Sequence, residues 1–414
     1  RAVRVMSLPR NIKEQFPLLS QVVNGHQIVY LDSAASSQKP AAVIEAMNDY
    51  YRTINANVHR GAYEIAAQAT EAMESSRERI AKFIGANSAN EVVFTKNATE
   101  SFNLVARSWG GQNLSHGDAV LITDMEHHAN IVPWQILSAE LGFEIRWIPL
   151  TPDGQLDLTS LDQLLDGVKM VSLTAMSNVL GTLNPVREIA DRAHEIGALV
   201  TVDASQYVPH FPTDVEDLGA DLMCFTGHKM CGPTGIGVLW GHEELLDSMP
   251  PFLGGGEMIV DVRKDGFTAN EIPHKFEAGT PPIAEIIGLG AAVEFLESLG
   301  MADIRQHEIQ LTKYAMNALN NRYGDELTIH GPRDPDQRGG VLSIEYRDVH
   351  PHDLSQVLDQ RGICIRAGHH CAKPLMKLLG VGATSRASMY LYNDESDIDA
   401  LVDALEPAGE MFAL

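Results

Sequence analysis

Short apolar runs alternate with amphipathic stretches between about residue 90 and residue 240. The apolar runs are rich in Val, Leu and Ile, which predicts buried β-strands. The stretches between them repeat their apolar positions at helical spacing, which predicts helices. Strand and helix in alternation predict a mostly parallel sheet with helices on both faces. The predicted strands are 92–94, 119–123, 144–148, 170–174 and 199–202, and the predicted helices are 99–109, 131–141 and 185–196.

The alternation ends after two further strands, 222–225 and 236–240, which flank a tight loop. Segments rich in Pro and Gly at 250–256 and 277–282 predict loops. A second set of elements follows: helices at 283–299, 304–322, 352–361 and 396–405, and strands at 340–346 and 364–366. We therefore predict a segment 1–25 that packs with the small domain, a large domain 26–298 and a small C-terminal domain 299–414.

Composition narrows the class of protein. Of 414 residues, 44% are hydrophobic and 21% are charged, which is typical of a globular protein in water. Lys and Arg number 31 against 55 Asp and Glu, so the net charge of −24 disfavours nucleic acid and anionic membranes as partners. No apolar run reaches the roughly 18 residues of a membrane span. Residues 1–10 are basic with no apolar run behind them, so we expect no secretory signal and a cytoplasmic location.

The chain has four cysteines, and no two of them form a Cys-x-x-Cys pair. Four in a chain of this length do not form a disulfide framework, so we expect reduced thiols. Cys224 and Cys364 lie inside predicted strands and are expected to be core residues. Cys371 lies in a loop bounded by Gly and Pro, beside His369, His370 and Lys373. Such neighbours favour a reactive thiolate. A buried core cysteine or a zinc ligand is the alternative, although ligand spacing for zinc is absent.

Lys229 lies in the loop between strands 222–225 and 236–240, with Gly227, Gly232 and Pro233 around it. A lysine between buried strands is placed for partial desolvation, which a Schiff-base lysine needs. The alternative is a solvated surface lysine, and the loop alone does not decide between them.

Asp203 favours the first interpretation. It ends the strand at 199–202, and open α/β sheets bind ligands at the carboxyl ends of their strands. A carboxylate there can keep a pyridinium nitrogen protonated, which makes pyridoxal phosphate an electron sink. Gln206 is expected to reach the phenolic oxygen of the same ring. A role for Asp203 as a helix cap or turn residue is the alternative.

Two more strand ends carry candidate cofactor contacts. Residues 97–100 open a helix, where Thr99 and the adjacent amides suit a phosphate, although ordinary capping explains them too. After the strand 119–123, a histidine of the pair His127 and His128 is placed to stack on a planar ring. Adjacent histidines lack the spacing of a helical zinc site, so we predict no metal.

Arginine suits the capture of a substrate carboxylate by paired hydrogen bonds. Arg386 is the first candidate for this role, with a surface salt bridge as the alternative. Arg366 and His59 are weaker candidates for contacts with the substrate.

The order of these residues resembles the pyridoxal-phosphate-dependent cysteine desulfurases, in particular their Suf-type (group II) branch in the class V aminotransferase superfamily. The resemblance covers nearly the whole chain. Its motifs are Leu31-Asp-Ser-Ala-Ala-Ser, Asn57-Val-His-Arg-Gly61, Glu126-His-His-Ala-Asn-Ile-Val-Pro-Trp134, Ser177-Asn-Val-Leu-Gly181, Asp203-Ala-Ser-Gln206, Gly227-His-Lys229, Gly232-Pro-Thr-Gly-Ile-Gly237, Glu277-Ala-Gly-Thr-Pro281, Arg366-Ala-Gly-His-His-Cys-Ala372 and Arg386-Ala-Ser.

This resemblance implies an α/β fold of the type I pyridoxal-phosphate transferases, with a mostly parallel sheet in the large domain and an α+β small domain. It implies that Lys229 carries the cofactor, Asp203 faces the pyridine nitrogen, and His127 stacks on the ring. The other implied roles are phosphate binding by Thr99, Thr226 and His228, phosphate binding across a homodimer by Thr280, carboxylate binding by Asn178 and Arg386, and sulfur attack by Cys371.

The resemblance further implies conversion of L-cysteine to L-alanine, with a persulfide on Cys371 and a Suf-type acceptor that receives the sulfur for iron–sulfur cluster assembly. Three alternatives stay open: a selenocysteine lyase, a class V aminotransferase, and a scaffold that binds the cofactor without turnover. One departure is Met230-Cys231, where such enzymes carry an apolar pair after the lysine. Cys231 is then either a second reactive thiol or a small packed residue.

Overall fold

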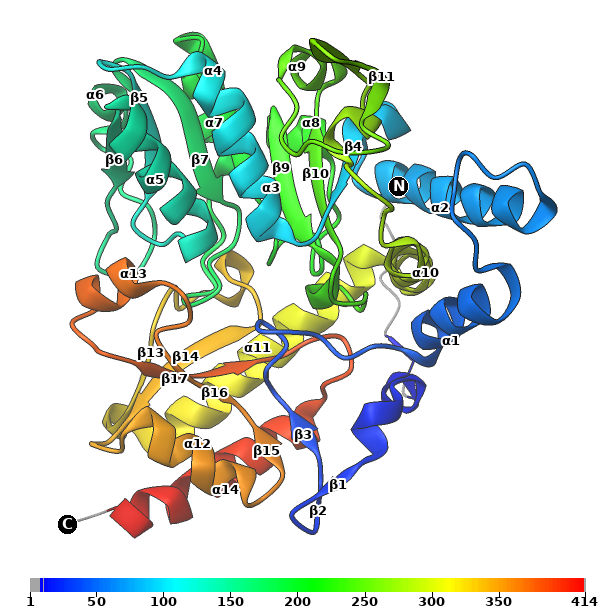
Figure 1. The fold of residues 1–414 in the computed structure, drawn as a ribbon. Helices are drawn as coiled ribbons and strands as arrows, with labels where there is room; N and C mark the ends of the chain where they lie inside the picture. The colour runs from blue at the N-terminus through cyan, green and yellow to red at the C-terminus, as the bar shows by residue number, and fades with distance from the viewer. Residues whose placement is uncertain (1–7, 10, 413–414) are drawn as a thin grey trace, which may run out of the picture.

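The seven strands predicted between residues 92 and 240 assemble into one sheet in the upper part of the molecule (Figure 1). The structure is a computed structural model that describes residues 8–9 and 11–412. Residues 1–7, 10 and 413–414 lie outside the described part, and with them most of the basic segment 1–10. In spatial order the strands are β4 (Val92–Thr95), β10 (Gly237–Gly241), β9 (Leu222–Thr226), β8 (Leu199–Asp203), β7 (Val168–Thr174), β5 (Ala119–Thr123) and β6 (Glu144–Ile148).

All strands of this sheet except β10 run in the same direction. Successive side chains of a strand point to opposite faces, so each face acquires its own apolar layer. In β5, Val120 and Ile122 join one layer, and Ala119 and Leu121 join the other. The first layer is covered by α3 (Ala98–Leu104) and α5 (Val132–Leu141), and the second by α2 (Glu64–Phe83), α7 (Val186–Glu195) and α10 (Ile283–Leu299).

A second, antiparallel sheet forms the lower part of the molecule (Figure 1). Its spatial order is β13 (Leu327–Ile329), β14 (Val341–Tyr346), β17 (Thr384–Ser388) and β16 (Arg366–Gly368). Apolar side chains of α11 (Met301–Tyr323), α12 (Pro351–Asp359) and α14 (Glu395–Phe412) pack with β14 in one core. The observed α/β fold with a mostly parallel large sheet and a smaller C-terminal unit confirms the predicted fold class.

The N-terminal part of the chain contacts elements far along the sequence. β3 (Val29–Tyr30) pairs in parallel with β15 (Ile363–Cys364). Phe16 packs edge-on against Phe295 and Tyr392. The proposed domain boundaries near residues 25 and 298 stay a prediction.

The remaining helices and strands are short. They are η1 (Ile12–Gln15), η2 (Pro17–Ser20), β1 (Val22–Val23), β2 (His26–Gln27), α1 (Ala41–Asp49), η3 (Tyr50–Ile54), η4 (Ala89–Glu91), α4 (Gly111–Asn113), η6 (His128–Asn130), α6 (Leu161–Leu165), α8 (Val215–Leu218), η7 (Gly227–Lys229), α9 (Glu243–Ser248), β11 (Ile259–Arg263), β12 (Gly266–Ala269), η8 (His274–Phe276), η9 (Gly324–Glu326), η10 (Pro335–Gln337) and α13 (Lys373–Leu378). None of the described helices combines the length and the apolar composition needed to cross a membrane.

Several elements differ from the prediction, among them α1 and α2, which were not predicted. The helix expected at 99–109 changes after α3 into the π-helical turn η5 (Val105–Gly110). The strand expected at 364–366 is divided, because β15 pairs with β3 whereas β16 pairs with β17. The segment after the predicted loop 250–256 forms the exposed hairpin β11–β12, whose apolar alternation is too short to stand out in the sequence.

The contact between α2 and α10 depends on Gly290. A methyl group there would lie 2.7 Å from Ser76 Cβ and 3.2 Å from Ser76 Cα, so the two helices would have to move apart. We expect Gly290→Ala to lower the free energy of unfolding by about 1–3 kcal/mol, as overpacking does. Gly111→Ala is the matched control, since a methyl group at that helical position meets no atom within 4 Å. Denaturant unfolding measures both, and equal midpoints for the two variants would contradict the packing argument.

Candidate active site

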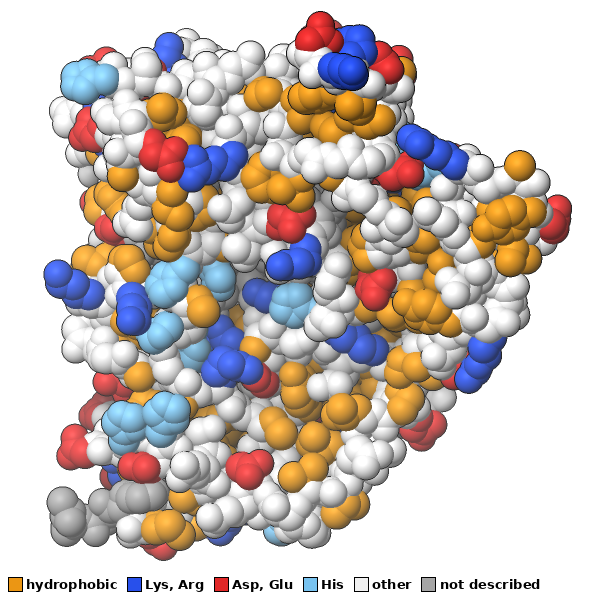
Figure 2. Space-filling view, viewed as in Figure 1, with side chains coloured by type: hydrophobic (Ala, Val, Ile, Leu, Met, Phe, Trp, Pro, Cys, Tyr) orange, Lys and Arg blue, Asp and Glu red, His pale blue; other side chains and the backbone are white. Residues whose placement is uncertain are grey.

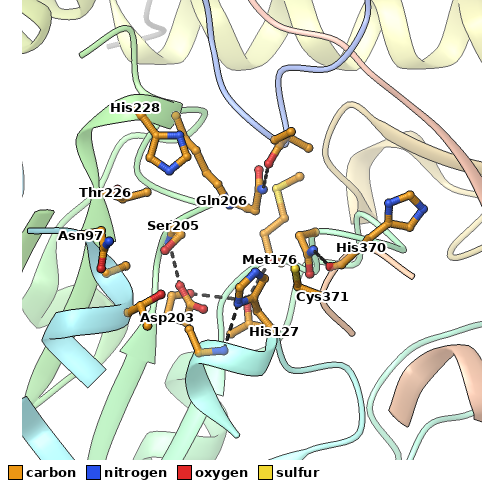
Figure 3. Close-up of a pocket in the computed structure, with 18 of the residues that line it drawn as sticks. Asn97, His127, Met176, Asp203, Ser205, Gln206, Thr226, His228, His370 and Cys371 are labelled. Carbon is orange, nitrogen blue, oxygen red and sulfur yellow. Dashed lines mark hydrogen bonds between the residues drawn. The ribbon is translucent and has the colours of Figure 1, made fainter. Parts of the chain in front are cut away.

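A cavity of about 330 Å³ lies between the carboxyl ends of the large sheet's strands and the small antiparallel sheet. Asn97, Thr226 and His228 lie at one end of it and His370 and Cys371 at the other, with Asp203 and His127 between them (Figure 3). On the surface, histidine and basic side chains gather where the two sheets meet (Figure 2). Eleven of the predicted site residues line this cavity: Thr99, His127, Asn178, Asp203, Gln206, Thr226, His228, Lys229, Arg366, Cys371 and Arg386.

The loop that carries Lys229 is fixed by its backbone. Gly227 donates its N–H to the carbonyl of Ile236, and its own carbonyl accepts the N–H groups of Met230 and Gly232. A methyl group on Gly227 would lie 2.8 Å from Ile236 Cγ2, so only glycine fits. The peptide before Lys229 is held as well, because the His228 carbonyl accepts the ammonium of Lys39 at 2.8 Å. Lys229 therefore enters the cavity from a rigid turn.

Burial lowers the pKa of Lys229 to about 8, although the charge of Asp203 acts in the opposite direction. A lysine with this pKa is partly neutral at physiological pH, as a nucleophilic amine needs to be. Asp203 itself is buried, and burial raises its pKa. Ser205 donates its backbone N–H to Asp203 Oδ1 at 3.0 Å and opposes that rise. A buried carboxylate in this position favours a cationic partner in the cavity.

His127 is held as a neutral ring. Its Nδ1 accepts the N–H of Ala129 at 3.0 Å, which leaves the proton on Nε2. Burial, followed by the charge of Lys229, lowers the pKa of His127 to about 3. A neutral imidazole beside Asp203 can stack on a planar group without adding charge to it.

Four buried polar atoms of cavity-lining residues have no hydrogen-bond partner among the described residues: Gln206 Oε1, Thr226 Oγ1, His370 Nδ1 and Arg386 Nε. Such atoms are normally satisfied, so they indicate that the cavity is shaped for a polar ligand. Gln206 donates to the carbonyl of Ala34 at 2.7 Å, and its amide nitrogen carries a second hydrogen for the predicted contact with a phenolic oxygen. Near Thr226, Asn97 caps the start of α3 and accepts the N–H of Glu100 at 2.9 Å.

At the opposite end, Arg386 and Asn178 form a chain of hydrogen bonds. Arg386 Nη1 donates to the carbonyl of Asn178 at 2.9 Å, and Asn178 Nδ2 donates to the carbonyl of His370 at 2.8 Å. Burial lowers the pKa of Arg386 to about 10, and its Nε has no partner within the described chain. Arg386 Nη2 lies 3.8 Å from Asp32 Oδ1. The buried guanidinium therefore keeps an unpaired donor, which suits an anionic ligand such as a carboxylate.

Cys371 is the one exposed cysteine of the four, and all four are free. Its carbonyl accepts the N–H of His128 at 2.7 Å, and its own N–H donates to His369 Nδ1 at 3.2 Å. Both His370 and Cys371 adopt left-handed backbone conformations, with φ of 52° and 53°. This conformation is uncommon for residues other than glycine and often marks a functional turn.

The remaining cysteines fit packing roles. Cys231 is fully buried, and burial raises its pKa to about 12. Cys224 is fully buried in β9, and burial raises its pKa as well. Cys364 is half-buried, and burial also raises its pKa. A thiol whose thiolate form is disfavoured makes a poor nucleophile. Cys231 therefore fits the description of a small packed residue.

Two predicted residues do not reach this cavity. His59 lies with Glu74 and His274, and its Nε2 contacts Glu74 Oε1 at 3.0 Å. The structure does not bring it to the substrate end of the cavity. Thr280 is exposed and lies outside the lining residues. Its predicted contact, to the cofactor of a neighbouring subunit, stays a prediction.

The sequence predicts no cavity or ion-pair contact for three residues that shape the site: Ser205, His370 and Asp32. Ser205 stands two residues after Asp203, the spacing of an Asx turn, and this spacing is a usable signal. His370 contacts Thr384 Oγ1 through Nε2 at 2.9 Å and lines the cavity. Asp32 accepts hydrogen bonds from Arg366 across more than 300 residues of sequence, and no local pattern announces such a contact.

Comparisons with known proteins agree with this geometry. The family model for aminotransferase class-V matches residues 29–401. The chain belongs to the aminotransferase class-V family, with cysteine desulfurases as its curated relatives. The chain is 52% identical over 407 residues to a protein of Streptomyces coelicolor named "Probable cysteine desulfurase", with 97% of each chain covered. It is 48% identical over 416 residues to the cysteine desulfurase of Haloferax volcanii, again with 97% of each covered.

Solved structures give the same relationship. The apo cysteine desulfurase of Thermococcus onnurineus superposes with a TM-score of 0.93 at 38% identity, covering 98% of this chain and 99% of that one. The cysteine desulfurase CsdA of Escherichia coli, solved as the S-sulfonic acid, gives 0.91 at 38% identity, covering 99% and 100%.

Members of this family depend on pyridoxal phosphate, and the cavity residues fit that group. A lysine amine, a buried carboxylate, a neutral histidine ring and the unpaired Thr226 hydroxyl lie around one space. The lysine amine suits the aldehyde of the cofactor, and the buried carboxylate suits its pyridinium nitrogen. The neutral histidine ring suits the planar ring of the cofactor, and the threonine hydroxyl suits its phosphate.

The lowered pKa of Lys229 gives a testable pH dependence. Only the neutral amine is nucleophilic, so the acylation rate of Lys229 in cofactor-free protein should rise with pH and level off above about 8. In the denatured chain the same lysine should keep gaining reactivity toward the ordinary value of 10.5. Peptide mass spectrometry after brief exposure to an acylating reagent, normalised to the denatured chain at each pH, measures the difference. Identical profiles would contradict desolvation of Lys229.

Proposed function

We propose that this protein is a cysteine desulfurase, which converts L-cysteine to L-alanine and keeps the sulfur as a persulfide on Cys371. The observation that carries the proposal is the position of Cys371, an exposed thiol at the rim of the same cavity that holds Lys229 and Asp203. An aminotransferase needs no thiol there. The high identity to cysteine desulfurases over the whole chain supports the same conclusion.

Pyridoxal phosphate, when bound, supplies an electron sink for negative charge that develops on the amino-acid carbons. Asp203 would keep a proton on the ring nitrogen, and His127 would hold the ring by stacking. Thr99, Thr226 and His228 would bind the phosphate, and Gln206 the phenolic oxygen. Lys229 would hold the cofactor covalently at rest. Once free, its neutral Nζ would take the proton from Cα of the substrate and later return a proton to the product.

The substrate end of the cavity suits a small amino acid. Arg386 would bind the α-carboxylate with its unpaired Nε edge, beside Asn178. Bound in this way, the amino acid would share one cavity with Lys229 and Cys371, which both line it. The Cys371 thiolate would then attack the substrate's sulfur. The bond between sulfur and Cβ would break, and a new sulfur–sulfur bond would form on Cys371.

The outer sulfur of the persulfide has to be transferred from Cys371 to a second nucleophile. Cys371 lies in an exposed turn, so a partner's thiol can approach it. We propose that a Suf-type acceptor receives the sulfur for iron–sulfur cluster assembly. We also propose a homodimer in which Thr280 reaches the phosphate of the neighbouring subunit, because Thr280 is exposed and lies outside its own cavity. Four free cysteines fit a reducing compartment such as the cytoplasm.

Replacement of the two least buried cysteines tests the proposal. We expect Cys371→Ser to release alanine from L-cysteine at least about a hundredfold more slowly than the unmodified protein, because its nucleophile is missing. Cys364→Ser is the matched control, since Cys364 is half-buried and outside the cavity lining, and it should keep the full rate. Alanine quantified by amino-acid analysis gives both rates. Full activity of Cys371→Ser with L-cysteine would refute the proposed nucleophile.

The cofactor lysine is tested separately. Lys229→Ala should lose both the visible absorption of the bound cofactor and its borohydride-reducible attachment. Lys39→Met removes another lysine beside the site, one whose pKa burial also lowers to about 8, and it should retain the attachment. A reducible adduct that persists in Lys229→Ala would exclude Lys229 as the attachment point.

A further inference from the structure

Two histidines and one glutamate lie together outside the cavity between the two sheets. His59 lies in the segment between η3 and α2, Glu74 lies on α2, and His274 begins η8. One possible ligand atom of each lies within 4.8 Å of the other two. In the described part of the chain, no other group of three or more His, Cys, Asp and Glu side chains has this spacing.

The spacing of these atoms suits a zinc ion. Two histidines and one glutamate form a known type of zinc site, in which water takes the fourth position. Ligand atoms about 2.0–2.1 Å from a tetrahedral ion lie roughly 3.3 Å apart. His59 Nε2 and Glu74 Oε1 are 3.0 Å apart, so these two atoms can share one ion with little movement. The backbone of His59 is held to α2, because its N–H donates to Thr70 Oγ1 at 2.9 Å.

The carboxylate of Glu74 is ionised and fixed in orientation. Burial alone raises the pKa of Glu74, but hydrogen bonds from His59 and Arg77 lower it to about 2. Arg77 Nε donates to Glu74 Oε2 at 2.8 Å, which leaves Oε1 for the side of His59. Carboxylates that bind metals are usually held by such an outer hydrogen bond. Glu74 therefore has the charge and the support of a metal ligand.

His274 has an outer carboxylate of its own. Its Nδ1 lies 3.7 Å from Glu277 Oε2, which leaves Nε2 for an ion. Histidines that bind metals usually turn their other ring nitrogen to a carboxylate, and this contact fixes the ring. Glu277 is itself held in place, because it accepts hydrogen bonds from the backbone N–H of Phe94 at 2.8 Å and from Arg77 Nη1 at 2.6 Å.

The charges of the cluster leave one negative charge in excess. Both oxygens of Glu277 accept hydrogen bonds from the buried guanidinium of Arg77, so that pair is neutral as a unit. The charge of Glu74 is then left without a full counter-charge, beside two histidine rings. A cation that both rings can bind supplies that counter-charge.

We propose that His59, Glu74 and His274 form a binding site for one divalent cation of the zinc class. The ion joins three stretches that are far apart in the sequence: the segment before α2, α2 itself and η8. No metal was expected from the sequence, because no local spacing connects the three ligands. The site is separate from the proposed sulfur chemistry, since none of its three ligands lines the cavity that contains Lys229.

Zn²⁺ is the probe, and the cofactor-loaded Cys371→Ser protein is the parent, because an exposed thiolate binds zinc by itself. Equilibrium dialysis followed by metal analysis gives the number of bound ions and the dissociation constant. We expect one tightly bound ion per chain. His59→Gln and His274→Gln should each bind it at least about a hundredfold more weakly, since loss of a ligand exceeds the roughly 10–100-fold cost of losing an outer contact.

His194→Gln is the matched control. His194 Nε2 also contacts a carboxylate, that of Asp221 at 2.8 Å, but within the described residues this pair has no third ligand. The control should bind Zn²⁺ like the parent. Equal affinity in His194→Gln and His274→Gln would overturn the proposal, and so would binding that depends on only one of the two histidines of the site.

Thermal unfolding gives a second readout if a variant folds poorly at room temperature. Zn²⁺ should raise the unfolding midpoint of the parent and of His194→Gln, because an ion that binds only the folded chain stabilises it. It should not raise the midpoint of His59→Gln or His274→Gln, and an equal rise in all four proteins would refute the site. Neither measurement depends on the release of alanine, so failure of the desulfurase proposal would leave this result unaffected.

Discussion

The chain of hydrogen bonds from Arg386 to Asn178 and from Asn178 to His370 links the two sheets beside the cavity. Asn178 follows β7 of the large sheet, Arg386 lies in β17 of the small sheet, and His370 directly precedes Cys371. The bond from the His128 N–H to the Cys371 carbonyl adds a second link between the same two units. Because both links involve the turn of Cys371, the thiol is held at the rim of the cavity that contains Lys229. The proposed sulfur transfer depends on this relative position of the two sheets.

Inside the cavity, burial and paired charges divide the ionisable groups by role. Desolvation lowers the pKa of Lys229 to about 8 and that of His127 to about 3, so the amine is available as a nucleophile and the ring is neutral. The same desolvation raises the pKa of Asp203, which gives the carboxylate a strong preference for a cationic partner. Asp32 forms ion pairs with both Arg366, at 2.8 Å, and Arg386, at 3.8 Å. One cavity in a strongly acidic protein is therefore lined by two arginines and by a single exposed thiol.

Much of this arrangement could be predicted from the sequence because it follows strand ends. The apolar runs placed β5 and β6 with their observed bounds, and the residues after β8 and β9 were expected at one edge of the sheet. Lys229 and Asp203 were found in this way. Contacts between distant segments leave no local pattern in the sequence. The ion pair of Asp32 and Arg366 is an example, since these residues are 334 positions apart. The left-handed turn at His370 and Cys371 contains no glycine at those positions, so local propensity gave no sign of it. His59 was expected at the substrate from its motif, but in this structure it lies with Glu74 and His274, and its predicted contact stays a prediction.

We propose that one cavity joins a cofactor lysine to one sulfur-accepting thiol. Mapping the destination of the sulfur is the decisive measurement. The cofactor-loaded protein is exposed to L-cysteine, excess reagent is removed without reductant, free thiols are blocked, and the peptides are analysed by mass spectrometry. We expect a mass increase of one sulfur atom on the peptide that contains Cys371 and none on the peptides that contain Cys224, Cys231 or Cys364. Added sulfur on Cys231 or Cys364, or alanine release with no sulfur on Cys371, would contradict it.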